Sequence, residues 1–286
     1  MDIKCKVILA ACVLTSVLSC GKIEQRAADV VHDTWFEEDV QADTLAEEEE
    51  EELDIIEEES PALDGVFNDF LFAYLHSSRL RRERTARPLR LEHTDRPAKI
   101  LEDFDPVFEF GFLSGEYFTT LYGNSQQMRA DDEGELEEDS IVSLQRINLN
   151  DRTIRNFQFL RSQGRWRLDV VRESTFEDDD LCDYLNFYAR FCSDSLFQMQ
   201  SIADPLHVVI QGSEDEEGSI DGIIDADQWQ TFCPEMPAGI ISNIKKGQHY
   251  GGHRILLRKS GQSSGLQEIF TFTREKGEWR LTRYEN

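Results

Sequence analysis

The sequence has few basic residues for its length. Its 286 residues include 30 lysines and arginines against 57 aspartates and glutamates, so the formal net charge at pH 7 is −27. Proteins that bind nucleic acid generally do so by neutralising phosphates with cations. A chain this acidic is therefore a poor general partner for nucleic acid, and we expect no such partner.

Long apolar runs are also missing. The longest, about 13 residues, follows two lysines at the N-terminus, whereas a membrane-spanning helix needs about 20. Charge followed by a short apolar stretch is typical of a secretory signal. The end of the stretch, Val17-Leu18-Ser19-Cys20, resembles the bacterial lipobox.

Residues 1–20 are therefore predicted to be a lipoprotein signal peptide, with Cys20 as the lipid-attachment residue. Acyl chains on Cys20 would hold the chain at a membrane of the bacterial cell envelope, periplasmic or surface-exposed. The alternative is an ordinary cleaved signal with an incidental cysteine.

Cysteine is scarce in the rest of the chain, where only Cys182, Cys192 and Cys233 remain. An odd number does not make a disulfide framework. We expect Cys182 and Cys192 on one helix, about 15 Å apart, which is too far for pairing. They are interpreted as small buried apolar residues; one bridge to Cys233 is the alternative.

Residues 21–60 form the most acidic segment. Between Gly21 and Asp64 there are 18 acidic residues against two basic ones, and Glu47 to Glu52 are consecutive. Like charges repel and little can be buried, so this segment is predicted to be a disordered acidic linker. It is either a solvated spacer or an acidic docking tail. A helix is expected to start at Ser60-Pro61.

Two nearly identical phrases lie 113 positions apart: GRWRL at 164–168 and GEWRL at 277–281. Each sits in a block that alternates apolar and polar residues around a glycine, which predicts a β-hairpin. The matched residues are Phe157, Phe159, Arg161, Gly164, Trp166, Arg167 and Leu168 with Phe270, Phe272, Arg274, Gly277, Trp279, Arg280 and Leu281.

The match extends beyond the hairpins. Asp69-Phe70-Leu71 corresponds to Asp183-Tyr184-Leu185, and Pro88-Leu89 to Pro205-Leu206. The spacing drifts where acidic loops are inserted, within 125–139 in one copy and 212–222 in the other. The chain is thus predicted to contain two repeats, 61–174 and 175–286, each with helices first and strands after, an α+β pattern.

This arrangement resembles the nuclear-transport-factor-2-like (NTF2-like) fold, in which helices pack on a strongly curved antiparallel sheet to form a cone. In that superfamily a glycine, tryptophan, arginine and aliphatic residue often mark the last strand, as both phrases do. Lipid anchor, acidic linker and tandem units together resemble a family of Bacteroides-type lipoproteins carrying a domain of unknown function. The resemblance implies two tandem NTF2-like cones.

The repeated aromatic residues are expected to fill the space between sheet and helix. The alternative is that they line a ligand pocket, because the concave sheet face of this superfamily often encloses one. These candidate pocket or core residues are Trp166, Trp279, Phe157, Phe159, Phe270 and Phe272.

Complete catalytic or metal-binding motifs were not found. Gly111 to Gly115 reads GxxSG, one position away from a nucleophile elbow. His249 and His253 have a zinc-ligand spacing, but glycines between them argue against the helix that this motif needs. We therefore predict no catalytic residue, no metal and no cofactor.

One feature breaks the symmetry of the repeats. Six arginines fall within twelve residues, and the second repeat has no counterpart, so the fold does not require them. They are either a solvated helix end or an anion site for the chain's own glutamates, anionic lipid or an acidic glycan. They are Arg79, Arg81, Arg82, Arg84, Arg87 and Arg90.

The preferred function is noncatalytic binding of a small molecule or a cell-envelope partner by a membrane-anchored protein. The first alternative is an enzyme with an isomerase- or hydrolase-like site in one cone, and the second is a structural interaction module. A pocket lined by polar groups and open to solvent would favour binding. A buried acid with a raised pKa facing such a pocket would favour an enzyme, and two filled cones would favour a structural role. The sequence sets no oligomeric state.

Overall fold

A computed structural model describes residues 63–102, 104–134, 140–211, 218–232, 234–248, 250–262 and 265–286. These residues all belong to one compact unit. The predictions for Cys20, the linker 21–60, the helix start at Ser60-Pro61, Cys233 and His249 lie outside the described residues.

The first repeat begins with two helices and continues mainly as strands. Its elements are α2 (Phe67–His76), α3 (Ser78–Glu83), β1 (Thr85–His93), β2 (Lys99–Ile100), α4 (Pro106–Glu109), η1 (Gly111–Leu113), β3 (Tyr117–Tyr122), α5 (Ser125–Asp132), β4 (Ile141–Asn148), β5 (Thr153–Ser162) and β6 (Arg165–Thr175).

The second repeat follows the same order. Its elements are η2 (Phe176–Asp178), α6 (Cys182–Ser193), α7 (Ser195–Gln200), β7 (Ile202–Gln211), β8 (Ser219–Ile224), η3 (Ala226–Gln228), α8 (Trp229–Phe232), β9 (Ile240–Lys245), β10 (Arg254–Gly261), β11 (Gln267–Glu275) and β12 (Glu278–Glu285). Cys182 and Cys192 share α6, as expected, and both are free thiols.

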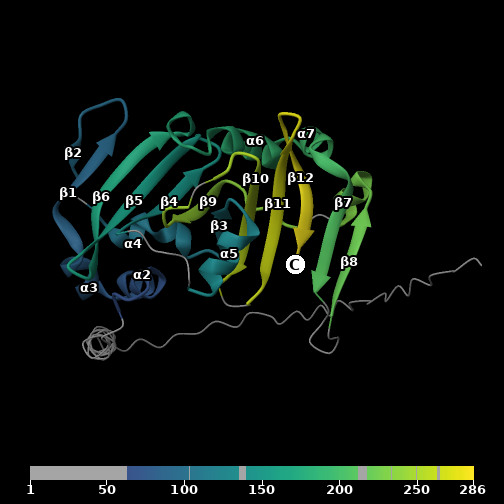
Figure 1. The fold of residues 1–286 in the computed structure, drawn as a ribbon. Coiled ribbons are helices and arrows are strands. Elements are labelled where there is room, and N and C mark those ends of the chain that lie inside the picture. Colours follow the sequence, from purple (N-terminus) through teal and green to yellow (C-terminus); the bar gives the residue numbers. More distant parts are fainter. Residues whose placement is uncertain are drawn as a thin grey trace, which may run out of the picture. The chain divides into compact units, whose positions relative to one another are not determined.

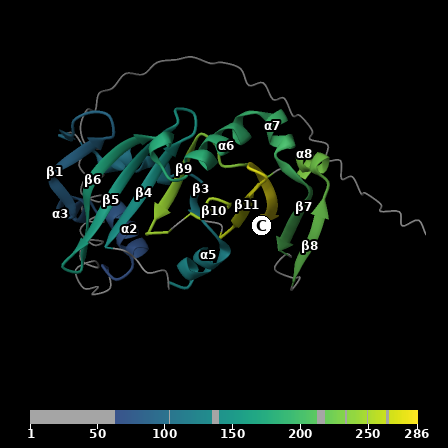
Figure 2. The ribbon, with the colours of Figure 1, turned by 45° about the horizontal axis from the view of Figure 1, so that its top comes forward.

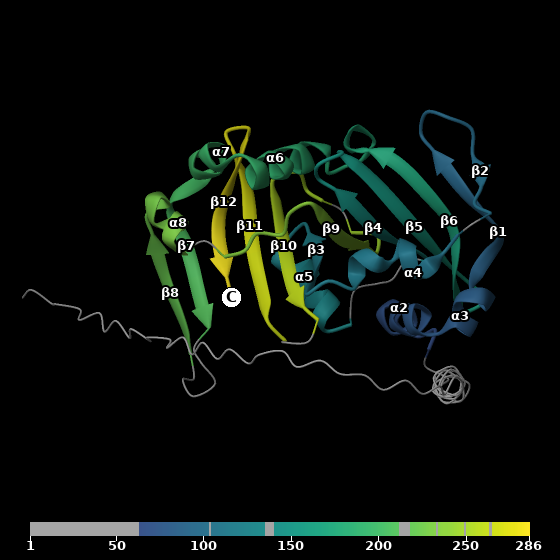
Figure 3. The same ribbon diagram turned by 180° about the vertical axis from the view of Figure 1, so that it is seen from behind.

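The strands form two six-stranded sheets, each covered by a helix pair (Figures 1 and 3). The first cone has the order β2-β1-β6-β5-β4-β9 and carries α2 and α3; the second has the order β3-β10-β11-β12-β7-β8 and carries α6 and α7. Pairing is antiparallel except for β1 with β6 and β7 with β12. The α+β fold is as predicted, with one parallel pair in each sheet.

The repeated phrases form matching hairpins. Gln163 and Gly164 have φ angles of 54° and 79°, and Lys276 and Gly277 have 51° and 90°. Two successive residues with positive φ make the tight turn whose twist suits paired strands, and glycine adopts this conformation without steric cost. Each hairpin also has a bulge at the same place, beside Phe159 in one and Phe272 in the other.

Aromatic residues build the core of each cone. In the first, Phe67 of α2 lies 5.3 Å from Phe159 and 5.1 Å from Trp166, measured between ring centroids. In the second, Tyr184 of α6 lies 5.6 Å from Phe272 and 5.5 Å from Trp279. Apolar residues at three- and four-residue steps place these rings on the face of each helix that meets the sheet.

The two sheets exchange one strand (Figure 2). Strand β3, from the first repeat, pairs with β10 of the second, and β9, from the second repeat, pairs with β4 of the first. Neither sheet is therefore made from one repeat alone. Sequence alternation does not reveal this exchange, because a short apolar strand has the same pattern whichever sheet it joins.

β3 and β9 cross at Thr119 and Ser242, which form two reciprocal pairs of hydrogen bonds. The backbone N–H of Thr119 donates to Ser242 Oγ (2.8 Å), and that hydroxyl donates to the Thr119 carbonyl (2.9 Å). In the same way the Ser242 N–H donates to Thr119 Oγ1 (2.9 Å), which donates to the Ser242 carbonyl (2.6 Å). All of these polar groups are buried and satisfied.

Among the residues that the structure describes, no helix has the length and apolar character needed to cross a membrane.

Candidate functional site

The candidate site lies on the inner face of the first cone, the face on which α2 packs. Along β5, Phe159 and Phe157 point to this face, and side chains two residues apart share a face of a strand. Arg155 is therefore on the inner face as well, beyond the aromatic core. On β4 the same spacing from Leu144 places Arg146 there, directly opposite Arg155.

Arg155 is held by two carboxylates. One of its terminal nitrogens donates to Glu109 Oε1 of α4 (2.7 Å) and the other to Glu173 Oε1 of β6 (2.6 Å). Burial raises the pKa of Glu109, although the charges of Arg155 and Arg146 act against this shift. Nδ1 of the buried His93 lies 3.2 Å from Glu173 Oε2, outside hydrogen-bond geometry.

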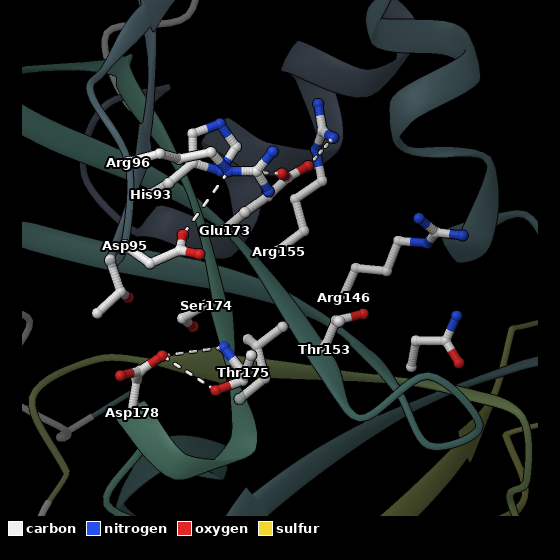
Figure 4. A pocket seen from close by; sticks show the side chains of 13 residues that line it. His93, Asp95, Arg96, Arg146, Thr153, Arg155, Glu173, Ser174, Thr175 and Asp178 are labelled. Atoms are coloured by element: carbon white, nitrogen blue, oxygen red, sulfur yellow. Dashed lines mark hydrogen bonds and ion pairs between the residues drawn. The ribbon is translucent and has the colours of Figure 1, made fainter.

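His93, Arg146, Arg155 and Glu173, but not Glu109, border a cavity of about 510 Å³ (Figure 4). Its walls come from the end of β1 and the following loop, from β4 and β5, and from β6 with the turn after it. The lining residues are His93, Thr94, Asp95, Arg96, Arg146, Asn148, Thr153, Ile154, Arg155, Glu173, Ser174, Thr175 and Asp178.

Arg146 differs from Arg155 in its contacts, since its charge acts on Glu109 without a direct bond. Its guanidinium forms no hydrogen bond or ion pair with any described residue, and Figure 4 shows it extended beside the polar groups. Like charges directly opposite one another destabilise a sheet. Arg155 already has two carboxylate partners, so Arg146 is the member of this pair whose hydrogen-bond donors are available to an anion.

The second cone has opposite charges at the matching positions. Lys259 and Glu268, 113 residues after Arg146 and Arg155, are also cross-strand partners, and they form an ion pair of 2.7 Å. Tyr284 donates a hydrogen bond to Glu268 (2.7 Å), and the buried Trp229 of α8 packs on Tyr284 at 5.9 Å. The second cone thus pairs these charges internally, at the place where Arg146 of the first cone has no hydrogen bond or ion pair with a described residue.

Comparison with known proteins identifies the family. Residues 46–286 match the family described as a domain of unknown function, DUF4348. The chain belongs to the DUF4348 family. A crystal structure of an NTF2-like protein from Bacteroides fragilis NCTC 9343 matches this DUF4348 chain with a TM-score of 0.66 and 25% sequence identity. The match covers 78% of this chain and 96% of the other. The search of curated proteins gave no match.

The structural match confirms the NTF2-like resemblance of the DUF4348 chain. The six predicted aromatic residues lie in the two cores, with Trp279 8% exposed and the other five fully buried: Trp166, Trp279, Phe157, Phe159, Phe270 and Phe272. None of them lines the cavity of Figure 4.

The predicted arginine cluster is divided between two roles. Four members are engaged by the protein: Arg79 by Glu83, Arg81 by the Leu75 carbonyl, Arg84 by Asp64 and Arg90 by Glu92. Arg82 and Arg87 are exposed and form no hydrogen bond or ion pair with a described residue. Arg81, Arg82 and Arg87 line a second cavity.

In the described part of the DUF4348 chain, no group of three or more His, Cys, Asp or Glu side chains lies close enough together to hold a metal ion.

Sequence reasoning missed Arg146, Arg155, His93 and Glu173. One signal was available, since Arg155 precedes Phe157 by two residues and a strand places both on one face. The pairing with Arg146 requires the register of β4 with β5, which a single sequence does not supply.

Proposed function

We propose that this DUF4348 protein is a membrane-anchored extracytoplasmic lipoprotein whose first cone binds, without catalysis, a small polar molecule or partner of the cell envelope. The binding site is the cavity bordered by His93, Arg146, Arg155 and Glu173. The observation that carries the proposal is Arg146, which lies opposite Arg155 and has no hydrogen bond or ion pair with a described residue. At the matching place the second cone has the ion pair of Lys259 with Glu268.

The chemistry of the cavity favours a ligand with an acidic group. A guanidinium binds a carboxylate or phosphate through two parallel hydrogen bonds. Glu173, Thr153 and Asn148 add acceptors and donors around it, which suit hydroxyl or amino groups of the same ligand. A sugar acid or a short peptide has this combination.

The test is thermal unfolding of the full-length chain against muropeptides, glycans, bile acids, fatty acids and short peptides. Ligand at 100 times its Kd adds about 2.7 kcal/mol of stability, which is readily measured. Arg146→Gln is expected to abolish the shift. The matched control Lys259→Gln, at the equivalent position of the second cone, should keep it even though its own stability falls.

The binding role would be contradicted if no compound raised the unfolding temperature, or if both variants lost the rise in unfolding temperature equally. A compound that stabilises the wild-type chain and is also turned over would identify an enzyme instead.

The anchor is proposed from the N-terminal pattern ending at Cys20, and it has its own test. Acyl chains contribute about 0.8 kcal/mol per buried CH₂, so a multiply acylated cysteine gives durable attachment. Cells producing the wild-type chain should incorporate a labelled fatty acid into the protein, whereas Cys20→Ala should stay unlabelled. Equal labelling of both chains would exclude Cys20 as the attachment site.

A further inference from the structure

Two of the six clustered arginines point to a second site. Arg82 on α3 and Arg87 on β1 line a cavity of about 510 Å³, separate from the cavity of Figure 4. Their neighbours Arg79, Arg81, Arg84 and Arg90 are occupied by protein partners. Arg81 also lines this cavity but donates to the Leu75 carbonyl, whereas Arg82 and Arg87 have no hydrogen bond or ion pair with a described residue.

The fold does not need these charges. The N-caps of α3 and α7, Ser77 and Asp194, are equivalent and both accept a hydrogen bond from the helix backbone. At the same spacing of 117 residues, Arg82 corresponds to Met199 and Arg87 to Asp204. The second repeat builds the same helix and strand without either cation.

The floor of this cavity is apolar. Leu89 is buried in the core of the first cone, and Leu101 and Phe104 pack against that core while remaining partly exposed. A smaller cavity of about 270 Å³ shares Arg81 and Pro106 with it and continues over Leu75, Phe110 and Leu113. The two cavities thus present a cationic end beside an apolar surface.

Acidic residues limit what can bind. Glu102 and Asp105 lie on the rim and are exposed. A compact polyanion would face both attraction and repulsion here. A single anionic group keeps the attraction of Arg82 and Arg87 while presenting less charge to the two carboxylates, and an apolar body can cover Leu101 and Phe104.

We propose that this cavity binds an amphiphilic anion: one carboxylate or phosphate held by Arg82 and Arg87, attached to a hydrocarbon or ring system that covers the apolar floor. Guanidinium groups recognise such head groups bidentately. The apolar body adds roughly 25 cal/mol for each Å² removed from water.

Isothermal titration calorimetry of the full-length chain with decanoate tests the proposal. Decanol, with the same chain and no charge, and acetate, with the charge and almost no chain, separate the two contributions. Decanoate is expected to bind at least tenfold more tightly than either, and more weakly as salt screens the contact.

The double variant Arg82→Gln/Arg87→Gln should weaken decanoate binding at least tenfold. Arg79→Gln, which removes an exposed neighbouring charge paired with Glu83, is the matched control and should leave it unchanged. Arg146→Gln should also leave decanoate binding unchanged, so the proposal for this cavity and the proposal for the first cavity are tested separately.

Decanol binding as tightly as decanoate, or equal weakening by Arg79→Gln, would overturn the proposal. So would the absence of decanoate binding at millimolar concentration. Vesicles containing phosphatidylglycerol distinguish a lipid head group in a membrane from a free ligand. If the chain binds these vesicles through Arg82 and Arg87 but does not bind decanoate, the arginines form a surface contact with charged lipid and the cavity is not a binding site.

Discussion

Asp131 is the residue whose environment departs most from its sequence context. It belongs to an acidic stretch expected to be a surface loop insertion, yet its side chain is 10% exposed, at the end of α5. Tyr122 donates a hydrogen bond to it (2.6 Å), and Lys246 forms an ion pair with it (2.9 Å). Arg258 contacts Asp131, Asp132 and the Tyr122 hydroxyl. The aspartate thus links α5 and β3 of the first repeat to β10 of the second.

Replacing Asp131 should destabilise the chain strongly. Asp131→Asn leaves Lys246 and Arg258 buried without a full counter-charge, which typically costs about 3 kcal/mol or more. The matched control is Asp132→Asn, whose side chain is 48% exposed and whose ion pair with Arg258 should be worth about 1 kcal/mol or less. Urea denaturation of both variants measures the difference, and equal losses would contradict the assignment.

The same contact predicts a pH dependence. Burial alone would raise the pKa of Asp131, but hydrogen bonds from Tyr122 and Lys246, together with the charges of Lys246 and Arg258, hold this pKa below its ordinary value. A carboxyl with a lowered folded pKa stabilises the fold above its unfolded pKa of about 3.9 and loses that contribution as pH falls through the folded value. The stability gap between wild type and Asp131→Asn should be constant from pH 5 to 7 and narrow below about 4.

At this scale the sequence predicts a residue well when its own strand or helix determines its surroundings. Trp166 and Trp279 are buried where alternation put them. Asp131 and Arg146 were not predicted, because their partners come from positions far away in the chain, 115 residues away for the ion pair of Asp131 with Lys246. Such partners follow from topology rather than from local pattern.

At the scale of elements, the crossing of β3 and β9 joins the two cones. Thr119 and Ser242 each supply a hydroxyl that replaces a missing backbone partner of the other strand. Neither residue type is unusual in a strand, so nothing in the sequence marks the pair. The matching hairpins, by contrast, follow from alternation and from Gly164 and Gly277, which adopt the positive φ that the turns require.

A double-mutant cycle measures this crossing. Thr119→Val or Ser242→Ala alone leaves the N–H and carbonyl of the opposite strand buried without partners, and each should cost about 1–3 kcal/mol. Because each hydroxyl serves the backbone of the opposite residue, the two substitutions remove different hydrogen bonds, and the double variant should cost about the sum of the single ones. Urea denaturation of the four chains gives the coupling. A double variant that costs clearly less than the sum would show that either substitution alone already separates the two strands.

At the scale of the whole molecule, the repeats are not independent bodies. Leu121 of β3 is fully buried in the core of the second cone, and Ile244 of β9 packs against the core of the first. The outer face of β4 and β5 adds Ile147 and Ile154 to the core of the second cone. A fragment with one repeat would therefore expose apolar residues that are buried in the intact chain, and its sheet would lack a strand.

This arrangement predicts that the repeats fold together. A fragment spanning 61–174 would retain β3 without its partner β10, while β4 would lose β9. This fragment alone should therefore aggregate or unfold without cooperativity, because its Leu121, Ile147 and Ile154 side chains would have to remain in water. The fragment 175–286 should behave in the same way, because β10 would lose β3 and β9 would lose β4. Mixed with 175–286, the fragment 61–174 should form a 1:1 complex in which both crossing strands are exchanged as in the intact chain.

Light scattering after size-exclusion chromatography gives the stoichiometry of this complex, and circular dichroism on heating gives the cooperativity of unfolding. Either fragment unfolding alone as a cooperative monomer, with the midpoint of the intact chain, would show that strand exchange is dispensable to the cone.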